Sequence, residues 1–329
     1  AMLWHFLAAA PYLPDGEYAC DATALVDVWP HQRRVVDDTA LAFPAGRLLC
    51  DEVGMGKTIE AMLILRRLLY GRGVKRALLL VPAGLLKQWQ DELREKGGLV
   101  VPRWENGYLH FPNGETRRAE AAEALAENDL LLSSREWARL ENNREMVLGA
   151  PAWDLVLLDE AHAARRSTPE EREFNSANLL LRLLREFQLR RRARGIVLLS
   201  ATPMQTQPWE PWDLLAVLGV GGEWMVEFDD IRVYYNGIRD LKHGTLDIQT
   251  AKRIAHLVAR DPEFPLLPDG ATVRIDQTHH THLSLYARAA RLGATNPVTW
   301  HNLAHYMSAT DAYRHPSGQV LQKHHLFAE

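Results

Sequence analysis

The sequence is poor in cysteine, with Cys20 and Cys50 alone among 329 residues. Two cysteines exclude a disulfide framework and a four-cysteine zinc site, and a reducing compartment is the default for such a chain. No apolar run approaches the roughly 20 residues that a membrane span needs. The apolar start, residues 2–14, lacks the basic segment of a signal peptide. We therefore expect a cytoplasmic protein with no membrane partner.

An excess of positive charge is also missing, because 38 Lys and Arg stand against 42 Asp and Glu, for a net charge of −4. This balance excludes a small domain that is basic throughout, but it leaves room for a local basic groove that binds nucleic acid. Hydrophobic residues make up 47% of the chain, which can support a core and rules out disorder as the whole description. At roughly 150 residues per domain, the length suggests about two domains.

Short apolar runs alternate with helical patterns up to about residue 220. Continuous apolar runs bounded by turn signals favour strands that are buried on both faces. The alternation predicts an α/β fold, a doubly wound parallel sheet with helices on both faces. The predicted strands are 47–50, 77–81, 129–132, 155–158 and 196–199, and the predicted helices are 57–70, 84–96, 116–128, 135–148 and 169–192.

A lead-in and two larger parts are expected from this pattern. Residues 1–29 read as a loosely structured lead-in, and residues 30–220 form the α/β domain. The alternation stops at the glycine-rich stretch 219–222, so residues 221–329 form a mostly helical extension, interrupted by the proline-rich segment 262–268. Eight of the 14 histidines lie between His279 and His325. Some have metal-ligand spacing, but no cysteine lies nearby, so exposed polar histidines are the favoured interpretation over a zinc site.

The sharpest signal is the segment DEVGMGKTIE at 51–60, which follows an apolar run and opens a helix. Gly54 and Gly56 would let the backbone approach phosphates, and the N–H groups at the helix start would point at the anion. Lys57 would reach the β and γ phosphates, and the Thr58 hydroxyl would ligate Mg²⁺. A glycine-rich turn without a ligand is the alternative, which the GKT triplet disfavours. The predicted nucleotide-binding loop comprises Asp51, Gly54, Met55, Gly56, Lys57 and Thr58.

A second signal is an apolar strand that delivers two adjacent carboxylates, Asp159 and Glu160, at its C-terminal end. Ligands of open α/β sheets bind at that end. Asp159 can hold Mg²⁺, and Glu160 can orient and deprotonate an attacking water. A strand followed by an acidic helix cap is the alternative. A third run, 196–203, ends in Ser200 and Thr202, and taken alone it indicates only a turn after a strand.

In this order, DEVGMGKT, LLLVPAGLLKQW, LLDEAH and LLSATP resemble the first motor lobe of helicase superfamily two, over about residues 28–220. The phosphate loop, with Asp51 where the general pattern has glycine, is similar to the Swi/Snf-type branch, especially its bacterial RNA-polymerase-associated and phage-defence members. The resemblance implies a RecA-like fold, ATP with Mg²⁺, and a DNA-dependent ATPase that moves along double-stranded DNA. It also makes Lys57, Asp159 and Glu160 the catalytic residues.

The resemblance implies further roles in the first half of the chain. Gln32 stands where the family keeps a glutamine that recognises adenine, although a simple helix-start residue is an equal alternative. The segment 82–89 matches the motif that touches the nucleic-acid backbone, which makes Lys87 and Gln88 candidates for that contact. Trp89, in the same segment, is as readily explained as a core residue.

Other implied roles fall at later strand ends. Ser133 and Ser134 match a strand end that contacts nucleic-acid phosphates. Ser200 and Thr202 resemble the motif that couples hydrolysis to movement of the strand. His162 would link the nucleotide site to that motif, the alternative being a helix residue that is bonded locally.

The arginine-finger motif Q-x-x-G-R-x-x-R of the family's second lobe is not found in these 329 residues. Such an arginine is worth roughly 10³ to 10⁵ in hydrolysis rate. We therefore expect this chain to bind nucleotide but hydrolyse it weakly, with a second RecA-like lobe supplied by the same full-length chain or by a partner protein. Two alternatives stay open: a nucleotide-gated interaction module of a split motor, and a DEAH-type helicase that separates strands.

Overall fold

The structure is a computed structural model, and it describes residues 17–51, 54–71, 73–166, 176–203, 209–220, 228–260, 312–314 and 320–322. No helix within these ranges is long and apolar enough to cross a bilayer. The chain divides into two compact units, residues 1–220 and residues 221–329. Each unit is described by itself.

The first unit is built on an eight-stranded sheet with the order β1-β8-β7-β2-β6-β3-β4-β5. The strands from β1 to β3 in this order pair in parallel, and β4 pairs antiparallel with both β3 and β5. The strands are β1 Arg47–Leu49, β2 Ala77–Val81, β3 Arg103–Glu105, β4 Tyr108–His110, β5 Thr116–Arg118, β6 Leu130–Ser134, β7 Trp153–Leu158 and β8 Ala193–Leu199.

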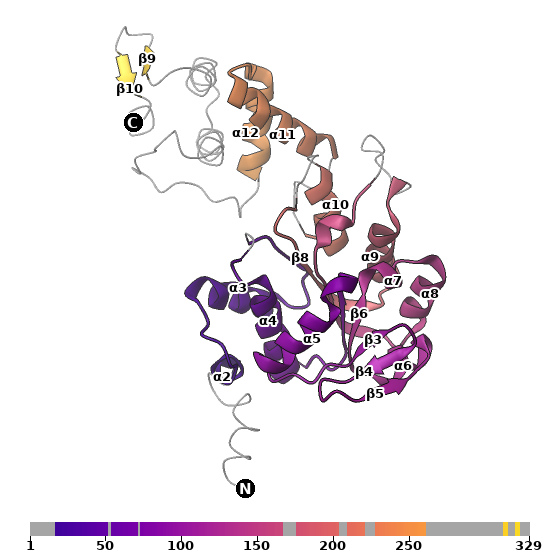
Figure 1. The fold of residues 1–329 in the computed structure, drawn as a ribbon. Coiled ribbons are helices and arrows are strands. Elements are labelled where there is room, and N and C mark those ends of the chain that lie inside the picture. Colours follow the sequence, from indigo (N-terminus) through magenta and orange to yellow (C-terminus); the bar gives the residue numbers. More distant parts are fainter. Residues whose placement is uncertain are drawn as a thin grey trace. The chain divides into compact units, whose positions relative to one another are not determined.

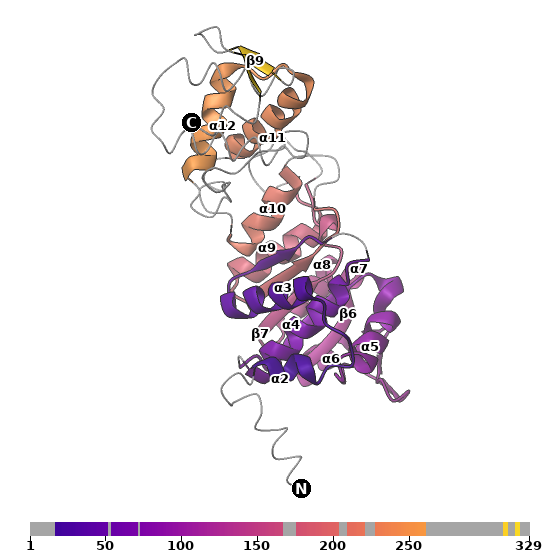
Figure 2. The same cartoon turned by 90° about the vertical axis from the view of Figure 1, so that its left-hand side faces the viewer.

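Helices lie on both faces of this sheet (Figures 1 and 2), which confirms the predicted doubly wound fold. The helices are α2 Glu17–Ala22, α3 Pro30–Ala42, α4 Lys57–Gly71, α5 Leu86–Glu95, α6 Ala121–Glu127, α7 Arg135–Ala138, α8 Glu141–Gly149, α9 Leu179–Leu189 and α10 Trp209–Leu218, with short 3₁₀ turns η2 Ala83–Leu85 and η3 Ala161–Ala163.

Strand β2 shows how the sheet separates two hydrophobic cores. All five of its residues are buried. Successive side chains of a strand point to opposite faces, so Leu78 and Leu80 join a core with α6, α8, α9 and α10, whereas Leu79 and Val81 join a core with α3, α4 and α5. Burial on both faces is the reason why this strand is a continuous apolar run rather than an alternating one.

Some predicted elements differ from the structure. The helix expected over 116–128 is wrong at its start, because β5 occupies 116–118 and α6 begins only at Ala121. The helix expected over 135–148 is two helices, α7 and α8. Strands β3, β4 and β5 were not predicted, because each has three residues and none forms an apolar run.

The lead-in also differs from its expected form, because helix α2 packs on helix α4. Arg67 of α4 forms ion pairs with Asp21 and with Asp37 of α3. The neighbouring Arg66 donates hydrogen bonds to the Cys20 carbonyl oxygen at 2.9 Å and to the Thr23 hydroxyl at 2.7 Å. These buried guanidinium groups attach α2 to the α/β unit.

The described part of the second unit contains two helices and one small hairpin. Helices α11 Phe228–His243 and α12 Ile248–Arg260 pack together, and β9 Ala312–Arg314 pairs antiparallel with β10 Val320–Gln322. A Cβ atom at Gly237 of α11 would collide with Ile254 of α12, so glycine permits their close approach. The histidine-rich and proline-rich segments noted in the sequence lie outside the described residues.

Candidate functional site

The sheet order brings three predicted motifs to one edge. Strands β1, β8 and β7 are parallel neighbours, so their C-terminal ends meet at the same edge of the sheet. Neighbouring strands lie about 4.8 Å apart, which places the ends of β1 and β7 about 10 Å from each other. The phosphate loop follows β1, the acidic pair follows β7, and Ser200 follows β8 between them. The distance between the phosphate loop and the acidic pair suits a triphosphate with a metal ion.

The phosphate loop has the backbone that the sequence predicts. Gly54 and Gly56 both have φ of +88°, a left-handed conformation that favours glycine. Helix α4 begins at Lys57, so its first N–H groups face the loop. The Lys57 Nζ donates a hydrogen bond to the carbonyl oxygen of Asp51 at 2.6 Å. The lysine is thus folded against its own loop, and Thr58 follows it in the first turn of the helix.

Gln32 of α3 joins that helix to the phosphate loop. Its Nε2 donates to the Met55 carbonyl oxygen at 3.0 Å, and its Oε1 accepts from the Trp29 amide at 3.0 Å. The side chain is buried, and a Cβ atom at Gly56 would collide with its amide group. A side chain at position 56 would therefore strain the backbone, because of its φ, and would displace the Gln32 amide. Recognition of adenine by Gln32 stays a prediction.

Glu60 belongs to the same region, although the sequence analysis did not select it. Its side chain is fully buried in the first turn of α4. Burial raises the pKa of Glu60 to about 8, and the neighbouring Asp51 carboxyl adds to the shift, first by a hydrogen bond that favours the protonated form and then by charge repulsion. An acidic residue three positions after the loop lysine was the only signal for it.

The carboxylate of Asp159 is held by two hydrogen-bond donors. The Glu160 amide donates to its Oδ1 at 2.8 Å, and the Trp89 indole Nε1 donates to its Oδ2 at 3.0 Å. Burial raises the pKa of Asp159, and these two hydrogen bonds oppose that shift. Glu160 has a left-handed backbone, with φ of +53°, which is uncommon for a residue with a side chain. Arg135 donates to the carbonyl oxygens of both acidic residues and so holds this turn.

His162 connects the acidic pair to the run at the end of β8. Its Nδ1 lies 3.1 Å from the Ser200 Oγ and 3.1 Å from the Glu160 Oε2. The Thr202 amide donates to the same Ser200 oxygen at 3.2 Å, and the Ser200 amide donates to the Leu49 carbonyl oxygen of β1. The structure therefore brings together the residues expected to couple hydrolysis to movement, and His162 is more than a locally bonded helix residue.

The residues predicted to contact nucleic acid are distributed differently. Lys87 and Gln88 lie on the exposed side of α5, where Lys87 pairs with Asp91 at 2.6 Å. Ser134 caps helix α7 by accepting from the Trp137 amide. Ser133 is 1% exposed and its buried hydroxyl has no hydrogen-bond partner among the described residues, so its contact with a phosphate stays a prediction. Strand β6 is buried on both faces from Leu131 to Ser134, which is why this hydroxyl lies away from solvent.

The residues present fit a nucleotide with Mg²⁺. The two glycines form a cradle that a side chain would strain, and Thr58 and Asp159 supply oxygen atoms at the sheet edge. Within the described ranges, no group of three His, Cys, Asp or Glu forms a metal site by itself. Mg²⁺ in nucleotide sites takes only one or two protein oxygens in addition to phosphate oxygens and water, so no such group is needed.

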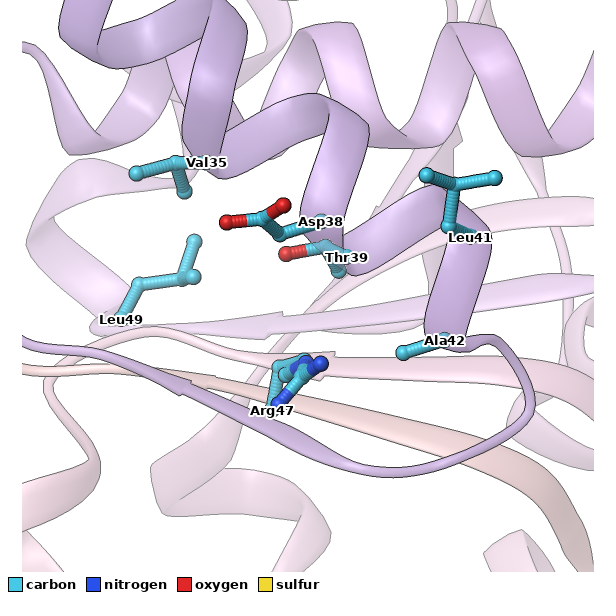
Figure 3. Close-up of a pocket in the computed structure, with 7 residues that line it drawn as sticks. All are labelled: Val35, Asp38, Thr39, Leu41, Ala42, Arg47 and Leu49. Atoms are coloured by element: carbon cyan, nitrogen blue, oxygen red, sulfur yellow. The ribbon is translucent and has the colours of Figure 1, made fainter. Parts of the chain in front are cut away.

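A pocket of about 540 Å³ lies between α3 and β1 (Figure 3). The figure shows the Asp38 carboxylate and the Arg47 guanidinium reaching into it from opposite sides. The other lining residues are Val35, Thr39, Leu41, Ala42 and Leu49. None of the predicted site residues lines this pocket.

Comparison with known proteins identifies relatives over the α/β unit. The sequence model of the SNF2-related domain matches residues 31–249. The chain is 33% identical over 192 residues to the uncharacterized ATP-dependent helicase YqhH of Bacillus subtilis, and 35% identical over 175 residues to the RNA polymerase-associated protein RapA of Stutzerimonas stutzeri. The two matches cover 58% and 53% of this chain but only 29% and 17% of these relatives.

One solved structure with a similar fold is the SWI2/SNF2 ATPase core of Sulfolobus solfataricus in complex with dsDNA. The similarity covers 66% of this chain and 41% of that chain, with 15% identity and a TM-score of 0.47. The family assignment rests on the sequence matches.

Proposed function

Because the chain belongs to the SNF2-related domain family, we propose that it is the ATP-binding lobe of a translocase that moves along double-stranded DNA. The observation that carries the proposal is the meeting of phosphate loop, acidic pair and Ser200 at one sheet edge. The similarity to a protein named as an ATP-dependent helicase supports ATP as the nucleotide. The DE-x-G-x-GKT loop supports duplex DNA as the track. A cytoplasmic location is part of the same proposal.

Residues of the phosphate loop and of the acidic pair have different roles in hydrolysis. Thr58 and Asp159 would hold Mg²⁺, which when bound would neutralise charge on the phosphates. Lys57 exchanges the Asp51 carbonyl for phosphate oxygens, and the loop N–H groups stabilise the developing negative charge. Glu160 orients the attacking water and accepts its proton. His162 contacts both Glu160 and Ser200, so it links a change at the Glu160 carboxylate to the end of β8.

Force generation requires a second RecA-like lobe, from the same full-length protein or from a partner. Closure of the two lobes on ATP would supply the arginine finger and move the duplex relative to the exposed face of α5, where Lys87 and Gln88 lie. The sequence matches cover only 29% and 17% of the two relatives. The translocase activity and the two partners, duplex DNA and a second lobe, are therefore proposals for the whole protein.

The test is a titration of the chain with a fluorescent ATP analogue in the presence of Mg²⁺. We expect the wild-type chain to bind and Lys57→Ala to lose binding, because the lysine charge at the phosphates is removed. Lys87→Ala removes the same charge from an exposed site on α5 and is expected to bind the nucleotide as the wild type does. Identical titrations for wild type and Lys57→Ala, with both proteins folded by circular dichroism, would contradict the proposal.

The second candidate is a nucleotide-gated interaction module whose turnover depends on a partner chain. It is favoured by the sequence observation that these 329 residues contain no Q-x-x-G-R-x-x-R motif. Rapid DNA-stimulated turnover by the purified chain alone would remove it. A DEAH-type helicase is the remaining alternative, and a strand-displacement assay on the whole motor distinguishes it, because a duplex translocase moves without separating strands.

A further inference from the structure

Trp89 lies at the contact between helix α5 and the acidic pair. Its side chain is 3% exposed, and its indole N–H donates to the Asp159 Oδ2 at 3.0 Å. The contact follows from the sheet, because β2 and β7 are neighbours with Leu80 in register with Leu158. The segment after β2 therefore runs beside the residue after β7, and α5 begins there.

Helix α5 has two chemically different faces. The inner face buries Leu86, Trp89 and Leu93 in the core. The outer face carries Lys87, whose side chain is 75% exposed, and Gln88. One helical turn thus bears both the predicted contact to nucleic acid and the donor that holds the metal-binding carboxylate. A displacement of the helix by DNA would move the indole N–H relative to Asp159.

The two donors on Asp159 have different origins. The Glu160 amide is part of the same turn and holds Oδ1 locally, whereas the Trp89 indole comes from a separate element and holds Oδ2. The terminal torsion of an aspartate side chain is broad, so one donor alone leaves the carboxylate free to rotate about it. With a donor on each oxygen, the carboxylate plane is set, and each oxygen keeps a lone pair for the metal or its water.

We propose that Trp89 is a positioning residue that orients Asp159 for Mg²⁺ and couples the outer face of α5 to the nucleotide site. The inference rests on the proposed function, and it assigns to Trp89 a role that packing alone does not require. Outer-shell partners of metal ligands typically change metal affinity by about 10- to 100-fold when they are removed. The expected effect of losing the indole N–H is therefore a weaker response to Mg²⁺.

The experiment compares Trp89→Phe with Trp153→Phe. Trp153, in β7, is also buried, and within the described part of the chain its indole N–H has no hydrogen-bond partner. Binding of the fluorescent ATP analogue is titrated with Mg²⁺ for both variants and the wild type. We expect Trp89→Phe to raise the Mg²⁺ concentration at half-saturation by about 10-fold or more, with metal-free binding in EDTA unchanged, and Trp153→Phe to match the wild type.

A variant with a non-natural residue separates loss of the N–H group from misfolding. Benzothienylalanine at position 89 keeps the ring shape and replaces the N–H with sulfur, so it should reproduce the Mg²⁺ shift without a change in thermal stability. If the wild type binds nucleotide and both position-89 variants titrate with Mg²⁺ as Trp153→Phe does, this inference is overturned while the proposed function stands. If the wild type binds no nucleotide, the proposed function itself fails.

The coupling is tested in the same assay with duplex DNA. Saturating DNA is expected to change the Mg²⁺ half-saturation of the wild type, because it moves the indole N–H relative to Asp159, and Trp89→Phe should lose this response. Lys87→Ala should weaken DNA binding but keep the response once the DNA is saturating. A response to DNA that is equal in wild type and Trp89→Phe would show that α5 does not transmit the contact through this hydrogen bond.

Discussion

Gln32 illustrates how one buried amide can hold a loop in place. Both ends of its amide group are already hydrogen-bonded, to the Trp29 amide and to the Met55 carbonyl oxygen. A net contribution of about 1 kcal/mol for each such bond would be enough to favour one loop conformation over others. We infer that Gln32 orders the phosphate loop before any base is bound.

This inference predicts that Gln32→Ala weakens the binding of ATP, GTP and inorganic triphosphate by a similar factor, about 5- to 30-fold for about 1 to 2 kcal/mol. The reason is that all three ligands bind to the phosphate loop through their phosphates. His31→Ala is the control, because the His31 ring lies 3.4 Å from the same Met55 oxygen at an exposed position. Competition with the fluorescent analogue gives the three affinities. A loss confined to ATP would assign Gln32 to adenine recognition instead.

Among the elements, helix α10 is attached to the segment after the acidic pair by a buried ion pair. Arg166 donates from Nε and Nη2 to the two carboxylate oxygens of Asp213, at 2.9 and 2.6 Å. Both side chains are fully buried, and the Arg166 guanidinium lies 5.3 Å from the ring centre of Trp212. This ion pair therefore joins the segment after Asp159 and Glu160 to helix α10, which follows β8 in the chain.

Removing one partner of this pair should cost much more than removing a surface partner. Asp213→Ala leaves a buried guanidinium without its carboxylate, and we expect the free energy of unfolding to fall by about 3 to 5 kcal/mol. Denaturant unfolding followed by circular dichroism measures the loss. Glu145→Ala is the matched control, because Arg190 holds Glu145 with the same two-bond geometry on the exposed surface. Equal losses in the two variants would contradict the assigned role of burial.

For the whole molecule, the proposed division between two lobes makes a kinetic prediction. The site described here contains the loop, the metal ligands and the base, but the proposed mechanism takes its arginine from elsewhere. Steady-state phosphate release from this chain with duplex DNA should be slow. Addition of the second RecA-like lobe of the full-length motor should raise it by roughly 10³- to 10⁵-fold. No acceleration, with binding between the two confirmed, would count against the two-lobe mechanism.

The order of motifs along the chain was enough to predict the parallel sheet and the residues of the phosphate loop and acidic pair. Those features are local: glycine is needed where φ is positive, and a buried strand must be apolar throughout. The short edge strands β3 to β5 were not predictable in this way, because their pairing partners lie elsewhere in the sequence and their own residues form no apolar run.

By itself, then, the sequence predicted which residues bind a triphosphate and determined at which strand ends they stand. Only the tertiary structure decided which of them touch. The adjacency of β2 and β7 put the Trp89 indole on Asp159, the packing of α3 over the loop put Gln32 on Met55, and the cover on both faces of β6 buried Ser133. The physical reason is that hydrogen bonds act over about 3 Å, and residues far apart in sequence come that close only when the sheet order is set.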